Sequence, residues 1–193
     1  MPRTTRRPEA RRDELVAAAY REIAENGFEG LRTREVAGKV GVNVATLHYY
    51  FPTKEDLIRA VLGYAMSRFQ STLSAGGTAV ERLRGHFQGL RRLARDEPEL
   101  FAAMAELTLR GSRDRTLAAT IEKTNQYWHA TLRAMLRGAR DDGDLPKAID
   151  PEGMAAVIVA TLRGVYLFPG KMTGAESVEK VLRQLERLSG LRG

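Results

Sequence analysis

Apolar residues recur at helical spacing along almost the whole chain. Residues 9–26 carry an apolar stripe on one face, and Gly27 is a plausible stop. Further stripes predict helices over about 53–73, from Val80 through Ala94, from Pro98 through Leu107, from Leu117 through Leu136, and over about 150–167 and 175–189. Polar residues, glycine and proline separate these helices. No stretch alternates as a strand would, so the pattern predicts an all-α fold.

Residues 33–54 contain two helices that are short and closely joined. Thr33 is expected to cap the first helix, and the small Ala37 lets two helices cross closely. Gly41 stands where the chain must turn, because glycine accepts the left-handed conformation without a Cβ clash. Asn43 is expected to cap the second helix, in which Leu47 faces inward. This is a helix-turn-helix arrangement, which places its second helix in a DNA major groove.

The second helix directs a polar face outward. Its outward side chains can donate, accept and make methyl contacts, the means by which base edges are read. They are Asn43, Ala45, Thr46, His48 and Tyr49. Helix pairs joined by glycine also occur as plain structural elements, with aromatic residues as core. The small residue, the turn glycine and the polar outward face together favour DNA reading.

In these segments the sequence resembles the tetracycline-repressor (TetR) family of transcriptional regulators. The matching segments are Gly41-Val42-Asn43, Thr46-Leu47-His48-Tyr49-Tyr50-Phe51 and Lys54-Glu55-Asp56-Leu57. Upstream, an amphipathic first helix, Gly27-Phe28 and Leu31-Arg32-Thr33 match as well. The resemblance covers about residues 9–60. His48 stands where the family usually has tyrosine, so a contact made there is expected to differ in strength or pH response.

The resemblance implies a homodimeric transcriptional regulator, most simply a repressor, that binds double-stranded DNA. Carried over residue by residue, it assigns phosphate contacts to Thr33, Tyr50 and Lys54, and groove contacts to the five outward side chains named above. Arg34 belongs to the same DNA-binding surface. A two-fold dimer places two reading helices about one DNA turn apart, ~34–36 Å, so the expected target is an inverted repeat.

The two closing helices are the expected dimer interface. Helix 150–167 is apolar on nearly every side, and helix 175–189 carries one apolar stripe. This combination suits a symmetric four-helix interface. The residues expected there are Ile158, Leu162, Val178, Val181, Leu182 and Leu185. The alternative is that helix 150–167 forms the centre of one chain's own core.

The central helices carry enough aromatic and thioether side chains to line a pocket. The candidate residues are Phe101, Met104, Leu107, Tyr127, Trp128, Met135 and Tyr166. The resemblance implies that such a pocket binds a small-molecule effector, which releases DNA by changing the spacing of the reading helices through helix 53–73. The alternative is that these residues are ordinary core.

The 193 residues carry a formal net charge of +7, which favours an anionic partner in general. Residues 1–60 hold 11 basic and 9 acidic residues, so the excess is not concentrated there. The basic, proline-interrupted residues 1–12 are expected to form a flexible arm along DNA. The expected domains are this arm, a DNA-binding domain over 9–60, and an effector-binding and dimerisation domain over 61–193.

Several functions find no support in the sequence. There is no cysteine, no metal-ligand cluster, no cofactor motif and no catalytic constellation around the three histidines. We therefore expect no enzyme, no metal and no cofactor. No apolar run approaches the ~20 residues that span a bilayer, so we expect a cytoplasmic protein without membrane contact. The competing interpretation is a basic dimeric helical scaffold that binds anionic surfaces without reading sequence.

Overall fold

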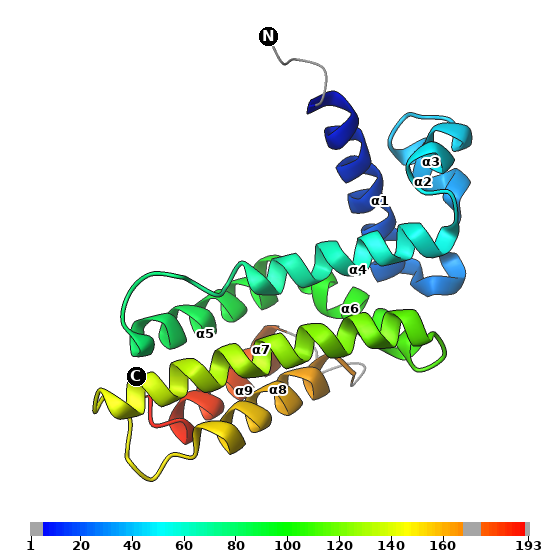
Figure 1. The fold of residues 1–193 in the computed structure, drawn as a ribbon. Coiled ribbons are helices and arrows are strands. Elements are labelled where there is room, and N and C mark those ends of the chain that lie inside the picture. The colour runs from blue at the N-terminus through cyan, green and yellow to red at the C-terminus, as the bar shows by residue number, and fades with distance from the viewer. Residues whose placement is uncertain (1–5, 168–174, 192–193) are drawn as a thin grey trace.

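The computed structural model describes residues 6–167 and 175–191, and within these ranges it contains helices and no strands. The helices are α1 (Arg6–Gly30), α2 (Thr33–Lys39), α3 (Val44–Tyr50), α4 (Lys54–Gln70), α5 (Ala79–Asp96), α6 (Pro98–Gly111), α7 (Arg115–Asp141), α8 (Pro151–Leu167) and α9 (Ala175–Leu188). The all-α prediction is confirmed. The chain divides visibly into a smaller group, α1 to α3, and a larger group, α5 to α9, which α4 connects (Figure 1).

We call α1 to α3 the head. α1 packs against α4 and α2, and α2 packs against α3. Gly27 interrupts α1 with a φ of +67°, so the predicted stop is confirmed as a kink, after which the chain continues helically to Gly30. Leu15, Ile23 and Leu47 are buried where these helices meet.

Two expectations about the head are wrong. Residues 6–12 belong to α1, so the expected flexible arm over residues 1–12 is helical from Arg6 onward, and residues 1–5 lie outside the described part. Arg11 and Arg12 have partners within the head: Arg11 Nη1 donates to the Val40 carbonyl at 3.3 Å, and the Arg12 guanidinium lies over the Phe51 ring at 5.1 Å. Thr33 does not cap α2; Arg32 occupies the cap position, without a side-chain hydrogen bond.

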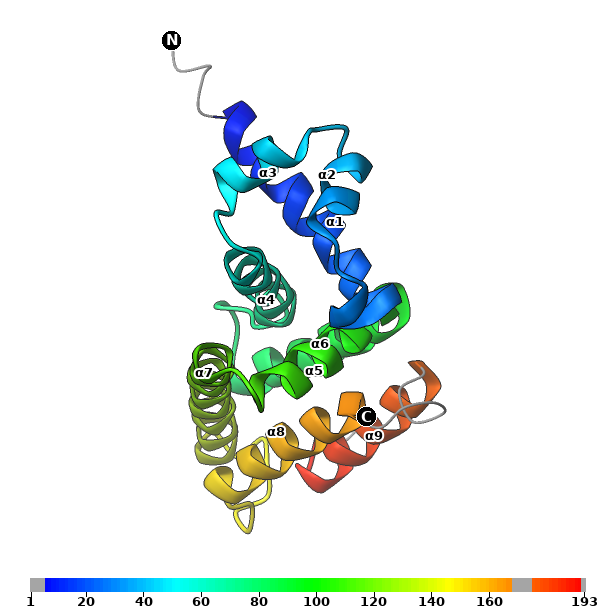
Figure 2. The ribbon, with the colours of Figure 1, turned by 90° about the vertical axis from the view of Figure 1, so that its right-hand side faces the viewer.

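We call α5 to α9 the body. α7 packs against α8 and α5, α5 also packs against α9, and α8 lies beside α9 (Figure 2). The buried side chains between them include Leu83, Phe87, Leu100 and Leu107. On the surface of the body, Arg91 of α5 forms ion pairs with two glutamates of α9.

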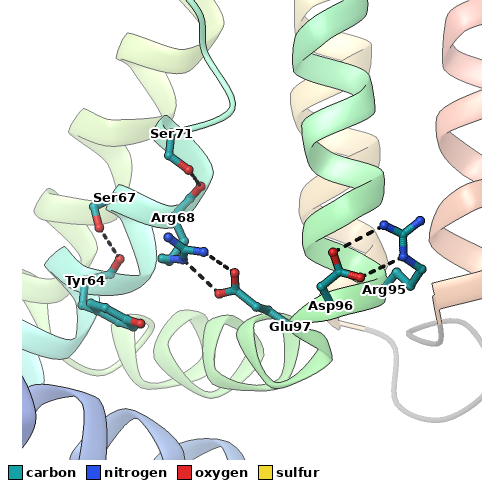
Figure 3. Close-up of polar contacts among 7 residues, drawn as sticks. All are labelled: Tyr64, Ser67, Arg68, Ser71, Arg95, Asp96 and Glu97. Atoms are coloured by element: carbon teal, nitrogen blue, oxygen red, sulfur yellow. Dashed lines mark hydrogen bonds and ion pairs between the residues drawn. The ribbon is translucent and has the colours of Figure 1, made fainter.

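The head meets the body at two joints. The first joint is α4, which continues from the head to the body. Near its end, Arg68 forms an ion pair with Glu97, which lies between α5 and α6 (Figure 3). Two nitrogens of Arg68 donate to the carboxylate, one of them Nε at 2.9 Å. In the second, α1 packs on α6, where the Phe28 backbone N–H donates to Glu106 Oε2 at 3.3 Å. α4 is continuous across the boundary expected between residues 60 and 61, and that boundary stays a prediction.

Candidate DNA-binding surface and ligand cavity

The turn between α2 and α3 has the geometry that the sequence predicts. Gly41 has a φ of +71°, in the region that glycine alone enters freely. Asn43 caps α3, since its Oδ1 accepts from the Thr46 backbone N–H at 2.8 Å. Ala37 and Leu47 are buried between the helices. α3 is therefore fixed by its cap, its turn and one apolar anchor.

The side chains on the outward face of α3 differ in how exposed they are. Ala45, His48 and Tyr49 are exposed, and Tyr49 is 81% exposed with its ring edge-on to Tyr50 at 5.2 Å. Thr46 is half-buried, and its hydroxyl donates to Asn43 Oδ1 at 2.9 Å. The carboxamide oxygen of the cap is thus engaged within α3, and Tyr49 is the side chain that projects most freely.

The other expected DNA-binding residues surround this face. Arg34 is exposed on α2, whereas Thr33 and Tyr50 are half-buried. Lys54 lies at the start of α4, with its Nζ 3.4 Å from the Phe28 carbonyl oxygen. Thr53 caps α4 together with Asp56 in a reciprocal capping box, as its position predicts. α2 and α3 lie together on the side of the head away from the body, and the chain passes from α3 into α4, which lies between them and the body (Figure 1).

A cavity lies in the body between α4 and the helices that face it. Its wall consists of aromatic and methionine side chains (Met66, Phe69, Phe101, Met104, Tyr127 and Trp128), aliphatic ones (Leu73, Leu90, Leu162 and Val178) and uncharged polar ones (Gln70, Thr124 and Asn125). None of these lining residues is charged. The space that the centre of a water molecule can occupy is about 40 Å³, so an organic ligand would enter only as side chains move apart.

The structure brings only part of the expected pocket together. Phe101, Met104, Tyr127 and Trp128 line the cavity, whereas Leu107 and Met135 are buried elsewhere in the core. Leu107 and Met135 therefore do not line the cavity, and a stripe of large apolar residues does not distinguish a cavity wall from solid core. The side chain of Tyr166 lies outside the described part.

Sequence reasoning missed Asn125, a polar member of this wall. It lies four residues after Ile121 and three before Trp128, so it shares the buried face of α7. Its Nδ2 is buried and has no hydrogen-bond partner among the described residues. An amide at a stripe position was the available signal, because polar side chains on a core face need partners.

His86, also missed, is a fully buried histidine on α5 beside the cavity. Trp128 Nε1 donates to His86 Nε2 at 2.9 Å, so the proton of the neutral ring resides on Nδ1. That nitrogen lies 2.6 Å from Thr72 Oγ1, which in turn donates to the Phe69 carbonyl at 2.6 Å. Burial lowers the pKa of His86 to about 4. A neutral, fully bonded chain therefore joins the cavity wall on α7 to the end of α4.

The expected dimer-interface residues are mostly inside the single chain. The buried ones are Ile158, Leu162, Val178, Leu182 and Leu185. Val181 is half-buried. The apolar pattern indicates that these faces are covered, and in the structure their own chain covers them, so the five buried residues do not form a free interface surface.

A different face of the closing helices is outward. On α8, Ala156, Val157 and Ala160 are exposed, with Val157 at 44%. On α9, Leu188 is 51% exposed. Ala156 and Ala160 border a groove between α7 and α8 whose lining also includes the charged side chains of Glu122, Arg133 and Arg163.

Comparison with known proteins places this helix-turn-helix fold in a family. The model for bacterial regulatory proteins of the tetR family matches residues 15–61, and the model for the tetracyclin repressor-like C-terminal domain matches residues 74–185. The chain belongs to the TetR family of bacterial transcriptional regulators. The resemblance noted in the sequence is thereby confirmed.

Individual relatives match to different extents. The transcriptional repressor KstR2 of Mycolicibacterium smegmatis is 30% identical over 90 residues, which are 45% of this chain and 44% of KstR2. The transcriptional regulator BetI of Rhizobium meliloti is 27% identical over 183 residues, 93% of this chain and 87% of BetI. The crystal structure of AibR in complex with isovaleryl coenzyme A and operator DNA shares the fold, with 20% identity, a TM-score of 0.68, and coverage of 92% of this chain and 97% of AibR.

Within residues 6–167 and 175–191, no helix combines the length and apolarity that crossing a bilayer requires. In the same ranges, no cluster of three or more histidine, aspartate or glutamate side chains is placed to hold a metal ion.

Proposed function

We propose that this chain is a homodimeric repressor that binds an inverted-repeat operator and leaves it when a small molecule occupies the body cavity. The observation that carries the proposal is the rigidly capped α3, whose free face ends in the 81% exposed Tyr49. The relatives support it, since they are transcriptional regulators and KstR2 is named a repressor. Such a regulator acts in the cytoplasm, where the bacterial DNA lies.

On DNA, the head residues divide by role. Ala45, His48 and Tyr49 are exposed and face the bases, together with the free edges of Asn43 and Thr46. The residues that face the phosphates are Thr33, Arg34, Tyr50 and Lys54. Phosphate contacts set the register, whereas base contacts set the sequence preference.

Dimerisation would use the outward face of α8 and α9. The small side chains of Ala156 and Ala160 allow two helices to approach closely, and Val157 and Leu188 supply apolar area at its edges. A two-fold axis through this face would pair α8 and α9 with their copies in a four-helix arrangement. The buried faces of the same helices stay in each chain's own core.

An effector would act through α4, which lines the cavity with Met66 and Phe69 and also leads into the head. A ligand shifts an equilibrium only by the difference between its affinities for the two states. The effector must therefore bind more tightly to the state whose heads are wrongly spaced for the operator. The linkage is reciprocal, so operator DNA lowers the effector affinity by the same factor.

The first test is selection of bound sites from a random duplex pool at fixed, near-physiological salt, because the electrostatic part of binding can otherwise hide specificity. An enriched inverted repeat supports both DNA reading and dimer symmetry. A pool that stays unenriched, also with refolded ligand-free protein, contradicts the proposal and favours the sequence-blind scaffold.

Two head variants separate the assigned roles. Tyr49→Ala is expected to relax the sequence preference, at a cost of about 1–3 kcal/mol on the best site. Lys54→Ala is expected to weaken binding to all duplexes alike and to lower the salt dependence by about one unit. Fluorescence anisotropy on the selected site and on a scrambled duplex measures both. A changed sequence preference in Lys54→Ala would show that the roles are misassigned.

A further inference from the structure

The wall of the body cavity offers one unusual polar group, the side-chain amide of Asn125. Its Nδ2 is buried without a hydrogen-bond partner among the described residues. A buried N–H that has lost its water and found no acceptor destabilises the folded state. A bound molecule that supplies an acceptor would remove this penalty.

The other donors of the wall are either engaged or exposed, as the Tyr127 hydroxyl is on a side chain that is 58% exposed. The indole N–H of Trp128 donates to His86 at 2.9 Å, and the hydroxyl of Thr124 donates to the Thr120 carbonyl at 3.0 Å. Gln70 is exposed. The Nδ2 atom of the half-buried Asn125 is thus the buried donor that remains for a ligand among the described residues of this wall.

The rest of the wall restricts the charge of that ligand. The lining side chains are aromatic, thioether, aliphatic or uncharged polar. A carboxylate or phosphate placed there would be desolvated without a counter-charge, which costs far more than an amide hydrogen bond returns. A cation could lie on the aromatic rings, but it would face the positive end of the Asn125 amide dipole.

We propose that the cavity is specific for an uncharged, mainly apolar molecule with one hydrogen-bond acceptor, a carbonyl or ether oxygen, that accepts from Asn125 Nδ2. This rests on the proposed function only in taking the cavity as the effector site. The cavity binds the apolar part of the ligand among Phe69, Phe101 and Trp128, while Asn125 fixes its orientation.

The experiment uses four small probes that differ in charge and in hydrogen-bond acceptors: acetophenone, its hydrocarbon counterpart isopropylbenzene, the anion benzoate and the cation tetramethylammonium. Trp128 is the single tryptophan of the chain and lines the cavity, so its indole N–H resonance in ¹H–¹⁵N spectra reports binding without DNA. The quantity measured is the ratio of the acetophenone affinity to the isopropylbenzene affinity.

Asn125→Leu removes the donor and keeps a similar side-chain shape, and Gln126→Leu is the matched control because Gln126 is an exposed amide on the same helix outside the cavity wall. The affinity ratio is expected to fall about tenfold in Asn125→Leu and to stay unchanged in Gln126→Leu. Asn125→Leu is also expected to raise the melting temperature of the ligand-free protein, because the unpaired N–H is gone. This second readout does not depend on any probe.

Three results would overturn the proposal: an unchanged ratio in Asn125→Leu, tighter binding of benzoate or tetramethylammonium than of acetophenone, or no probe binding up to the solubility limit. None of these concerns DNA. A failed site selection with a confirmed probe preference would instead refute the proposed repressor function and leave the ligand specificity standing.

Discussion

Acidification from pH 7.5 to pH 5.5 is expected to destabilise the folded protein through His86. The ring is fully buried, donates toward Thr72 and accepts from Trp128, so a second proton on Nε2 would break the bond to the indole. Burial lowers the pKa of His86 from its usual 6.5 to about 4. No charged side chain contributes to this shift.

The pKa difference fixes the sign and the size of the effect. Because the pKa is lower in the folded protein, the unfolded chain binds more protons between pH 6.5 and pH 4, and stability falls as the pH falls through this window. Below pH 4, where the ring is protonated in both states, the total loss of unfolding free energy from His86 is about 3 kcal/mol. Between pH 7.5 and pH 5.5 the loss of unfolding free energy is about 1 kcal/mol, in a range where most carboxylates stay ionised.

The assay is urea unfolding at the two pH values, with protein concentration held constant because a dimer's stability depends on it. His86→Gln removes the titrating group and retains an acceptor for Trp128, so this variant should lose about 1 kcal/mol less of its unfolding free energy over the same interval. If this variant does not fold, a protein with His48→Gln and His129→Gln serves instead, since it keeps His86 as its single histidine.

Equal losses in the wild type and in His86→Gln would refute the reasoning, as would a double variant that no longer responds to pH. Either result would mean that the His86 ring is accessible to water or already charged in the folded state. The hydrogen-bonded chain from Trp128 to the end of α4 would then have to be abandoned.

Two further predictions concern helix packing and assembly. Gly89→Ala places a Cβ 2.7 Å from Thr72 Cβ and is expected to lower the free energy of unfolding in urea by about 1–3 kcal/mol. In Gly85→Ala, on the same helix, the new Cβ meets nothing within 4 Å, so this variant is expected to raise the free energy of unfolding by about 0.5–1 kcal/mol. Val157→Glu is expected to weaken the dimerisation affinity more than tenfold in sedimentation experiments, because an unpaired charge would be buried. Lys180→Glu, on the exposed outer face of α9, is expected to leave the affinity unchanged. Equal dimerisation of the two variants would exclude the α8–α9 face as the interface.

Local features of the fold were predictable from the sequence because short-range chemistry determines them. Asn43 and Thr53 cap their helices through backbone N–H groups three residues away, and Gly41 adopts a conformation that few other residues tolerate. The prediction of a flexible arm is wrong for Arg11 and Arg12, because a basic run in the sequence does not reveal which groups its side chains contact. Their partners, the Val40 carbonyl and the Phe51 ring, come from distant parts of the chain.

The candidate sites were predictable only in part. The apolar face of α8 showed that Ile158 and Leu162 are covered, but periodicity does not say whether the cover is the same chain or a second copy. Likewise, Leu107 and Trp128 belong to similar stripes, yet only Trp128 borders a cavity. Which side chains adjoin a void depends on how several helices fit together, and this information is spread over the whole sequence.

The contact between α1 and α6 has a consequence for engineering. Chimeric regulators are naturally cut in a connecting helix such as α4, so that one head can be grafted onto another body. In this protein such a graft would also disrupt the contact between α1 and α6, where Glu106 accepts a hydrogen bond from the Phe28 backbone N–H just after the Gly27 kink. A transplanted head would therefore need both the glycine kink in its own α1 and a glutamate at the matching place in the recipient's α6. Without that pair, the transplanted head would lack the hydrogen bond that ties α1 to α6.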